Sequence, residues 1–210
     1  MSLRFGIDRT PRVVKDATEL LIAYRDDSGA DYLEFEPSTS PDVLVPEDLA
    51  VTILINSRVG PSAFQAVQHR APELDLGSLP SRPLEDSSDS DRDRVADTIA
   101  QMAEWPGFAA SVATKVLHKK RPATVPILDN QAIFGAYMNP QWPDMRSATD
   151  SVYDRTRIRE ALDWICTDLT APENQDAWRE LAELEPMRTR IELFDMVWWM
   201  YFRRLEPVLP

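Results

Sequence analysis

Cysteine and histidine are scarce in this sequence of 210 residues. It contains one cysteine, Cys166, and two histidines, His69 and His118. A single cysteine excludes an internal disulfide framework and any zinc or iron–sulfur site built from cysteines, and two histidines argue against an all-histidine metal site. We therefore expect no metal and no other cofactor.

Long hydrophobic runs are absent as well. The first sixteen residues hold no apolar run of the length that a signal peptide carries. The longest apolar stretches, such as residues 49–55, are far too short to span a bilayer. The sequence therefore predicts a cytoplasmic protein without a membrane partner.

Basic residues are outnumbered by acidic ones. There are 23 lysines and arginines against 35 aspartates and glutamates, which gives a formal net charge of -12. A protein that coats nucleic acid without specificity is basic, so this balance excludes general electrostatic adhesion to DNA or RNA. It is compatible with a local basic site within an acidic body.

Glycine is rare, with 6 residues against 17 prolines, and this is typical of a helical protein because tight β-hairpins depend on glycine. We predict a mainly α-helical fold, in which residues 1–210 form a single compact unit of two helical lobes. The clearest helical spacing is that of Ile158, Ala161, Leu162, Ile165 and Leu169, and of Ile191, Phe194, Trp198, Tyr201 and Leu205.

Three other segments carry local signals. Thr10 and Pro11 predict the start of a helix that runs to about Arg25. Residues 31–36 (DYLEFE) alternate in polarity, which predicts a short extended segment near the N-terminus. Residues 70–92 are rich in proline, serine and aspartate, and they predict a flexible linker.

The stretch from residue 105 to 130, WPGFAASVATKVLHKKRPATVPILDN, differs in charge from the rest. Pro106 and Gly107 predict a tight turn between two helices, and Pro122 ends the second helix. From residue 105 to 128 there are four basic residues and no acidic one. The stretch predicts a helix–turn–helix with a contact surface built from Lys115, Lys119, Lys120 and Arg121.

This stretch resembles the element that defines the HhH-GPD (helix-hairpin-helix) superfamily of DNA base-excision glycosylases, and the chain looks like a divergent short member. In that family a Leu-Pro-Gly-x-Gly hairpin precedes a helix of small residues, and a Pro-Val-Asp element follows. The corresponding elements here are residues 105–109 (WPGFA) and 126–129 (PILD), within the region 93–138. Residues 49–60 (LAVTILINSRVG) resemble the family's polar turn that wedges into the duplex.

The resemblance assigns roles to individual residues. Asp129 becomes the catalytic carboxylate, which stabilises the positive charge that develops on the deoxyribose and orients the attacking water. Backbone amides of the hairpin hold the DNA strand, and basic side chains neutralise its phosphates. The DNA-binding residues implied are Arg58, Asn56, Gly107, Ser111, Lys115, Lys119, Lys120 and Arg121. The base pocket implied is Phe134, Tyr137 and Trp142.

The implied reaction is hydrolysis alone. Ser111 stands eighteen residues before Asp129, where bifunctional members of the family carry a nucleophilic lysine, and a hydroxyl cannot form an imine. We therefore expect a monofunctional glycosylase whose partner is double-stranded DNA with a flipped base. It leaves an abasic site, in repair or in defence against foreign (phage) DNA that carries modified bases.

Two alternatives stay open. Asp129 opens a predicted helix, and aspartate is a preferred helix N-cap, so the stretch also fits a non-catalytic HhH module that binds DNA or a protein. A helical interaction protein without any role in nucleic-acid binding would instead turn its acidic surface toward a basic partner.

Overall fold

The structure is a computed structural model, and the statements below concern the residues that it describes. These are residues 1–9, 11–27, 29–37, 39–55, 57, 59–139 and 154–205.

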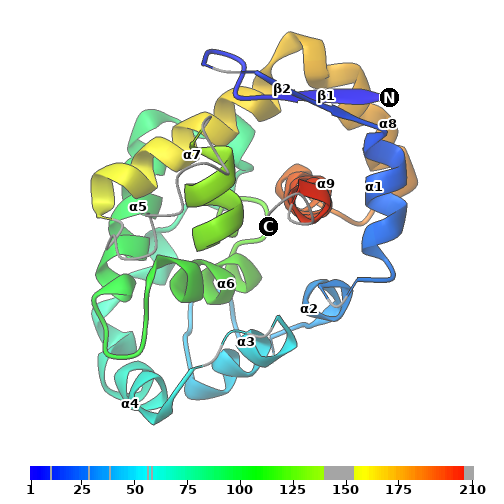
Figure 1. Cartoon of the computed structure of the whole chain (residues 1–210). Helices are drawn as coiled ribbons and strands as arrows, with labels where there is room; N and C mark the ends of the chain where they lie inside the picture. Colours follow the sequence, from blue (N-terminus) through cyan, green and yellow to red (C-terminus); the bar gives the residue numbers. More distant parts are fainter. Residues whose placement is uncertain are drawn as a thin grey trace.

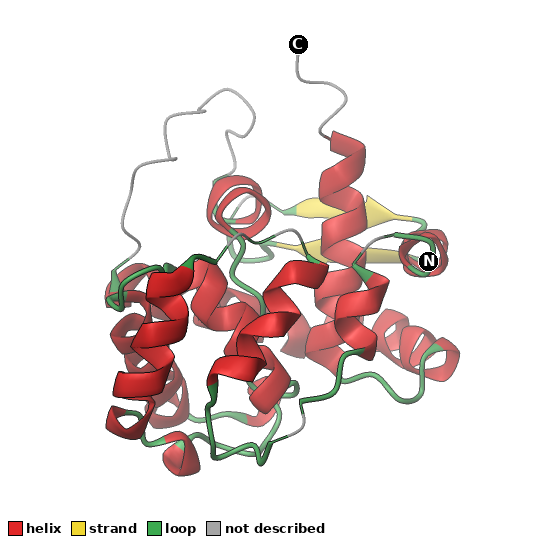
Figure 2. Cartoon of the chain, turned by 90° about the horizontal axis from the view of Figure 1, so that it is seen from below, coloured by secondary structure: helices red, strands yellow, loops and turns green. Residues whose placement is uncertain are grey.

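The described chain is mainly helical, which confirms the predicted mainly α class, and Figure 2 shows how little of it is strand. The N-terminal elements are β1 (Ser2–Phe5), β2 (Arg12–Lys15), α1 (Ala17–Tyr24), α2 (Ala30–Glu34), the 3-10 helix η1 (Pro46–Ala50), α3 (Val51–Leu54) and α4 (Pro61–Arg70). The 3-10 turns η2 (Ala71–Glu73), η3 (Leu76–Ser78) and η4 (Leu84–Asp86) follow. The later elements are α5 (Asp89–Ala103), α6 (Ala110–Lys120), the π-helix η5 (Asn130–Tyr137), α7 (Arg155–Thr170), η7 (Pro172–Asn174), α8 (Gln175–Leu184) and α9 (Arg190–Leu205).

Helix α9 lies in the middle of the molecule (Figure 1) and contacts α1, α7, α8 and η5. On another side of the molecule α5 packs against both α6 and α7, and α3 packs against α6. Large aromatic side chains fill the space between these elements, and Trp105, Trp178 and Trp198 are almost fully buried. The elements therefore share one continuous core, in which α9 is the central helix.

A β-hairpin stands where the sequence predicts the start of the first helix. Strands β1 and β2 pair antiparallel, with Phe5 opposite Arg12. Phe5 lies edge-on to Trp198, with ring centroids 5.4 Å apart. The Thr10–Pro11 prediction is thus wrong: the aromatic core holds this segment as a strand, and α1 begins at Ala17, after Asp16 in a left-handed conformation (φ 59).

The segment DYLEFE is also different from its prediction, because residues 30–34 form helix α2. Tyr32 and Leu33 are neighbours and both are buried. A strand cannot bury two successive side chains on one face, whereas a helix bends them toward the same core. The hydroxyl of Tyr32 donates a hydrogen bond to the backbone oxygen of Lys115 at 2.6 Å, which ties α2 to α6.

Residues 70–92 are packed against the core and do not form the predicted linker. Three 3-10 turns lie in this segment. Leu74, Leu76, Leu79 and Leu84 are all buried, and the amide of Leu84 donates to the oxygen of Ala123 at 2.8 Å. These four leucines anchor the segment to the hydrophobic core, although polar residues separate them in the sequence.

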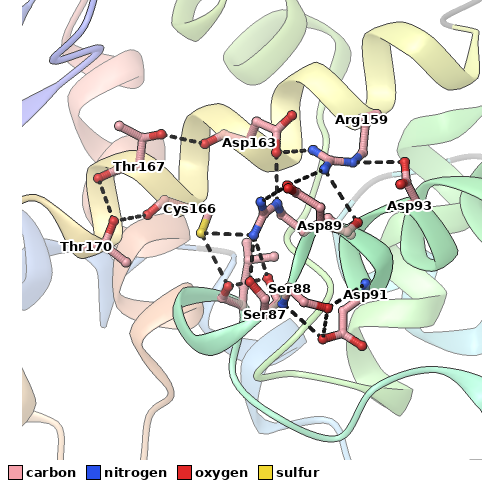
Figure 3. Close-up of polar contacts among 12 residues, drawn as sticks. Ser87, Ser88, Asp89, Asp91, Asp93, Arg159, Asp163, Cys166, Thr167 and Thr170 are labelled. Atoms are coloured by element: carbon pink, nitrogen blue, oxygen red, sulfur yellow. Dashed lines mark hydrogen bonds and ion pairs between the residues drawn. The ribbon is translucent and has the colours of Figure 1, made fainter.

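The acidic end of that segment ties α5 to α7 through ion pairs (Figure 3). Ser88 and Asp91 form a capping box that starts α5 at residue 89, inside the segment predicted as a linker. Arg159 of α7 lies 3.0 Å from Asp89 and 3.2 Å from Asp93. These carboxylates therefore serve the scaffold, as helix caps and as partners of arginine.

Candidate functional site

The predicted helix–turn–helix is present. Helix α5 ends at Ala103, and α6 begins at Ala110. Between them Gly107 has φ 84, a conformation that favours glycine. A Cβ at Gly107 would lie 2.8 Å from Ser62 Oγ and 2.9 Å from the amide nitrogen of Ala63, so the turn also sits close against the start of α4. The turn is exposed at Pro106 and Gly107.

Asp129 caps the π-helix η5 with one carboxylate oxygen. Oδ1 accepts hydrogen bonds from the amides of Gln131 (2.9 Å) and Ala132 (3.0 Å). The amide of Leu128 donates to Thr114 Oγ1 at 3.0 Å, which fixes the loop before Asp129 to α6. The other oxygen, Oδ2, lies 3.6 Å from Lys115 Nζ. The carboxylate is thus held in place at one oxygen and faces a lysine with the other.

A cavity of about 350 Å³ lies beside Asp129. This volume is within the range of about 300–1,000 Å³ that is usual for small-molecule sites. Its walls come from the end of α1, α2, the segment after α3, α6, η5 and α9. The lining residues are Tyr24, Asp27, Gly29, Tyr32, Ile55, Ser57, Lys115, Ile127, Asp129, Ala132, Ile133, Asp195, Trp198, Trp199 and Arg203.

Four aromatic side chains give the cavity flat walls, and the two indole nitrogens are anchored. Trp198 Nε1 donates to the oxygen of Ala132 at 2.7 Å, and Trp199 Nε1 donates to Asp27 Oδ1 at 3.3 Å. Burial raises the pKa of Tyr24 and of Tyr32, so both phenols stay neutral at physiological pH. Such walls suit a planar ring.

Asp195, on α9, brings a second carboxyl group to the cavity. Its Oδ2 accepts a hydrogen bond from the amide of Ile127 at 3.3 Å. Burial raises the pKa of this carboxyl well above its ordinary value, and the charge of Glu192 raises it further. The cavity therefore combines the clamped carboxylate of Asp129 with a carboxyl group whose protonated form is favoured, which is the arrangement used for acid–base work.

Of the predicted basic cluster, Lys115 alone lies in the cavity wall among the residues that the structure describes. Its Nζ donates to Ser57 Oγ at 2.7 Å, and its side chain is 10% exposed. Ser111, one turn earlier on α6, is buried and does not line the cavity.

The other three cations are engaged inside the protein. Lys120 Nζ pairs with Asp48 at 2.8 Å, and the two side chains are 1% and 4% exposed, so the prediction that Lys120 contacts DNA is wrong. Lys119 Nζ donates to the oxygen of Leu33 at 2.9 Å. Arg121 pairs with Asp42. These residues fasten the chain between α2 and η1 to the end of α6, and they do not form the predicted phosphate-binding patch.

The predicted base pocket is displaced. Phe134 is 2% exposed and does not line the cavity beside Asp129. Tyr137 is buried too, and its hydroxyl donates to Asp168 Oδ2 at 2.6 Å. Both side chains belong to the core, so their assignment to this pocket is corrected. Asn56, Arg58 and Trp142 lie outside the described residues.

The aromatic walls and Asp195 are the residues that sequence reasoning missed. One signal for them was available on α9. Asp195, Trp198 and Trp199 are three and four residues apart, so they share one face of the helix. A carboxylate on an otherwise aromatic face is costly to bury, which makes it a candidate for function. Tyr24 and Tyr32 carry no such local signal.

Neither a metal centre nor a membrane span is found in the described part of the chain. No three histidine, cysteine, aspartate or glutamate side chains there are grouped as a metal site requires. None of the helices described is both long and apolar enough to cross a membrane.

The fold and the site define a mainly helical protein with an exposed helix–turn–helix and a carboxyl-bearing aromatic cavity. Residues 16–202 match the family of unknown function DUF6308, and the chain belongs to that family. Neither the curated proteins nor the solved structures include a significant match to the chain.

Proposed function

We propose that this protein is a monofunctional DNA glycosylase with a two-lobed fold like that of the HhH-GPD superfamily. It hydrolyses the N-glycosidic bond of a damaged or modified base that has been flipped out of the duplex. The observation that carries the proposal is Asp129. Its carboxylate is clamped by two amides, follows the helix–turn–helix, and lies at an aromatic cavity.

The cavity supports base recognition. A base inside a duplex is out of reach, so an enzyme that acts on it must extrude it into a pocket and hold it there by stacking. Trp198 and Trp199 provide flat surfaces for this in the cavity wall. The exposed turn at Pro106 and Gly107 leads into α6, and the first backbone amides of that helix can donate to a phosphate of the strand.

The two carboxyl groups support the chemistry. As the bond from the sugar C1′ to the base nitrogen breaks, its electron pair stays with the base and positive charge develops on the sugar. Asp129 stabilises that charge and accepts the proton of the water that attacks C1′. Asp195, whose protonated form burial favours, gives its proton to the departing base. The products are a free base and an abasic site.

The position of the amines favours hydrolysis over strand cleavage. Ser111 has no amine and lies outside the cavity wall. Lys115 Nζ is engaged with Ser57 Oγ and lies near Asp129 Oδ2, so its role is to balance the carboxylate charge.

The test is an assay for abasic sites. The protein is incubated with duplexes that carry assorted lesions or phage-type modified bases, and alkali then converts abasic sites to strand breaks. We expect breaks with the natural protein and none with Asp129→Asn. Asn is also a good N-cap, so this variant keeps the start of η5.

Asp154→Asn is the matched control, because Asp154 caps α7 through the amide of Arg157 at 3.0 Å and does not line the cavity. This control should cleave like the natural protein. Breaks that persist in Asp129→Asn, or no breaks on any substrate, would refute the proposed glycosylase activity of this site.

A second candidate is a non-catalytic module that binds DNA or a protein. The two amide hydrogen bonds that Asp129 Oδ1 accepts favour it, because they are those of an ordinary helix N-cap. This candidate predicts that DNA is retained at about 50 mM salt, where phosphate contacts are strong, and that retention survives Asp129→Asn without breaks. If DNA does not bind at all, a protein partner is the remaining candidate.

A further inference from the structure

A second cavity, of about 240 Å³, lies between the N-terminal hairpin, η5, α7 and α9. It is lined by aromatic rings together with two arginines, and among the described residues it shares only Trp198 with the cavity beside Asp129. The lining residues are Phe5, Gly6, Arg9, Arg12, Tyr137, Trp164 and Trp198.

Arg9 places an unsatisfied cation at this cavity. Its guanidinium carbon lies 3.1 Å from the centre of the Trp164 ring, and its Nη1 atom is buried without a hydrogen-bond partner. A buried charged nitrogen without a partner is costly. In agreement with this, burial lowers the pKa of Arg9.

The carboxylates of Asp168, Glu160 and Asp8 each raise the pKa of Arg9 electrostatically, and the one with the largest effect, Asp168, is already occupied. Asp168 Oδ2 accepts from the amide of Gly6 (2.7 Å) and from the hydroxyl of Tyr137 (2.6 Å), while Oδ1 accepts from the amide of Ile7 (3.2 Å). Within the described chain no carboxylate lies within ion-pair distance of Arg9. The protein itself therefore leaves this guanidinium nitrogen unsatisfied.

Arg12 adds a second cation that is held without a carboxylate. It donates to the backbone oxygens of Ala136 and Asn139, at and just beyond the end of η5. Its guanidinium carbon lies 5.9 Å from the centre of the Trp198 ring. Burial lowers the pKa of Arg12 as well. Two positive charges thus meet one aromatic cavity, and an anion would relieve the cost of burying them.

We propose that this second cavity is a binding site for a small aromatic anion, with a planar ring between the aromatic walls and a carboxylate or phosphate group on Arg9. Guanidinium nitrogens bind these groups through short, charge-assisted hydrogen bonds, and aromatic walls suit a flat ring. The cavity is smaller than the range of about 300–1,000 Å³ for drug-sized ligands, so a single ring fits it better than a larger ligand.

Isothermal titration calorimetry on the full chain tests this proposal. The probes are benzoate and phenyl phosphate, with benzyl alcohol and benzylamine as ligands of similar shape without the negative charge. We expect at least one anion to bind with a Kd below about 1 mM and neither uncharged nor cationic probe to bind. The anion that binds more tightly shows whether the site prefers a carboxylate or a phosphate group. The proposal is overturned if neither anion binds, or if benzyl alcohol binds as well as they do.

Variants locate the binding. Arg9→Gln should weaken the preferred anion by about 10- to 100-fold, the usual loss for a hydrogen bond to a charged group. Arg4→Gln is the matched control, because Arg4 is exposed on β1 of the same hairpin and does not line the cavity. It should bind like the natural protein. Equal affinity in Arg9→Gln overturns the assignment.

Arg9→Lys covers the case in which Arg9→Gln does not fold, because it keeps the positive charge and loses the guanidinium. It should bind more weakly than the natural protein, and unchanged affinity again overturns the assignment. The abasic-site assay is independent of these titrations, so each proposal fails or stands by itself.

Discussion

Lys115 and Lys120 lie five residues apart on α6, and both are buried, yet they do different things. Lys120 is enclosed with Asp48 at 2.8 Å, and its amine also donates to Thr39 Oγ1. Lys115 lies 3.6 Å from Asp129 and lines a cavity. Because residue type and helix are the same, the space beside the ion pair is what separates a structural cation from a candidate functional one.

The largest effect is expected on the cavity side, at Asp195. Asp195→Asn keeps the shape of the carboxyl group but has no acidic proton, so it should lower kcat by about 10²- to 10⁴-fold, the usual contribution of a general acid. Because a raised pKa keeps the acid protonated, activity of the natural protein should fall as pH rises through that pKa. Single-turnover rates of the two proteins, measured over a range of pH, test both the loss of rate and the pH dependence. An unchanged rate and pH profile would remove Asp195 from the mechanism.

The buried ion pair between Lys120 and Asp48 should make the larger contribution to the free energy of unfolding. Lys120→Met leaves the buried carboxylate of Asp48 without its partner, and we expect a loss of about 3–5 kcal/mol in the free energy of unfolding. Urea titration measures it. Lys15→Met, at an exposed position on β2, is the control and should change stability little. A loss below about 1 kcal/mol would place the Lys120–Asp48 pair among ordinary surface ion pairs.

His118 lies on α6 between the two lysines, and it should make the free energy of unfolding depend on pH. It is fully buried, its Nδ1–H donates to the oxygen of Val125 at 2.7 Å, and burial lowers its pKa to about 4. An unfolded histidine titrates near 6.5, so the unfolded state takes up a proton first as pH falls. Stability that His118 supports above pH 6.5 is therefore lost between about pH 6.5 and 4.

Between pH 7 and pH 5 this loss amounts to about 2 kcal/mol. His118→Asn does not titrate and keeps a donor for Val125, so it should lack this part of the pH dependence. Urea unfolding of both proteins at the two pH values measures the difference, and groups that titrate in both proteins cancel. If the free energy of unfolding changed equally with pH in the two proteins, His118 would be protonated to the same extent in the folded and unfolded states.

The smallest effect on stability is expected at Lys115. Lys115→Met removes an ion pair of 3.6 Å beside a cavity, where water can reach the remaining Asp129, so unfolding should change by about 1 kcal/mol or less. The same variant should nevertheless reduce cleavage of a modified duplex, because Asp129 loses its neighbouring charge. A large stability loss without a loss of activity would make Lys115 structural, like Lys120.

Local sequence predicted α6, α7 and α9 and the position of Asp129 at the start of a helix. The spacing of apolar residues in 158–169 and 191–205 is present in α7 and α9, and Ala110–Lys120 ends before Pro122 as predicted. Asp129 caps η5 as its residue type indicates. Such features depend on contacts within a few residues, so a local pattern suffices to find them.

The walls of both cavities and the partners of the lysines were decided by the tertiary structure. Tyr24 and Asp195 meet Asp129 from distant parts of the chain, and Phe5 is held as part of a strand by the aromatic core. Which lysine is enclosed depends on where Asp48 lies in space. Sequence alone determined α6, α7 and α9 because helix hydrogen bonds are local. The start of α1, the helix α2, burial and ion pairing instead follow from packing between segments far apart in the chain.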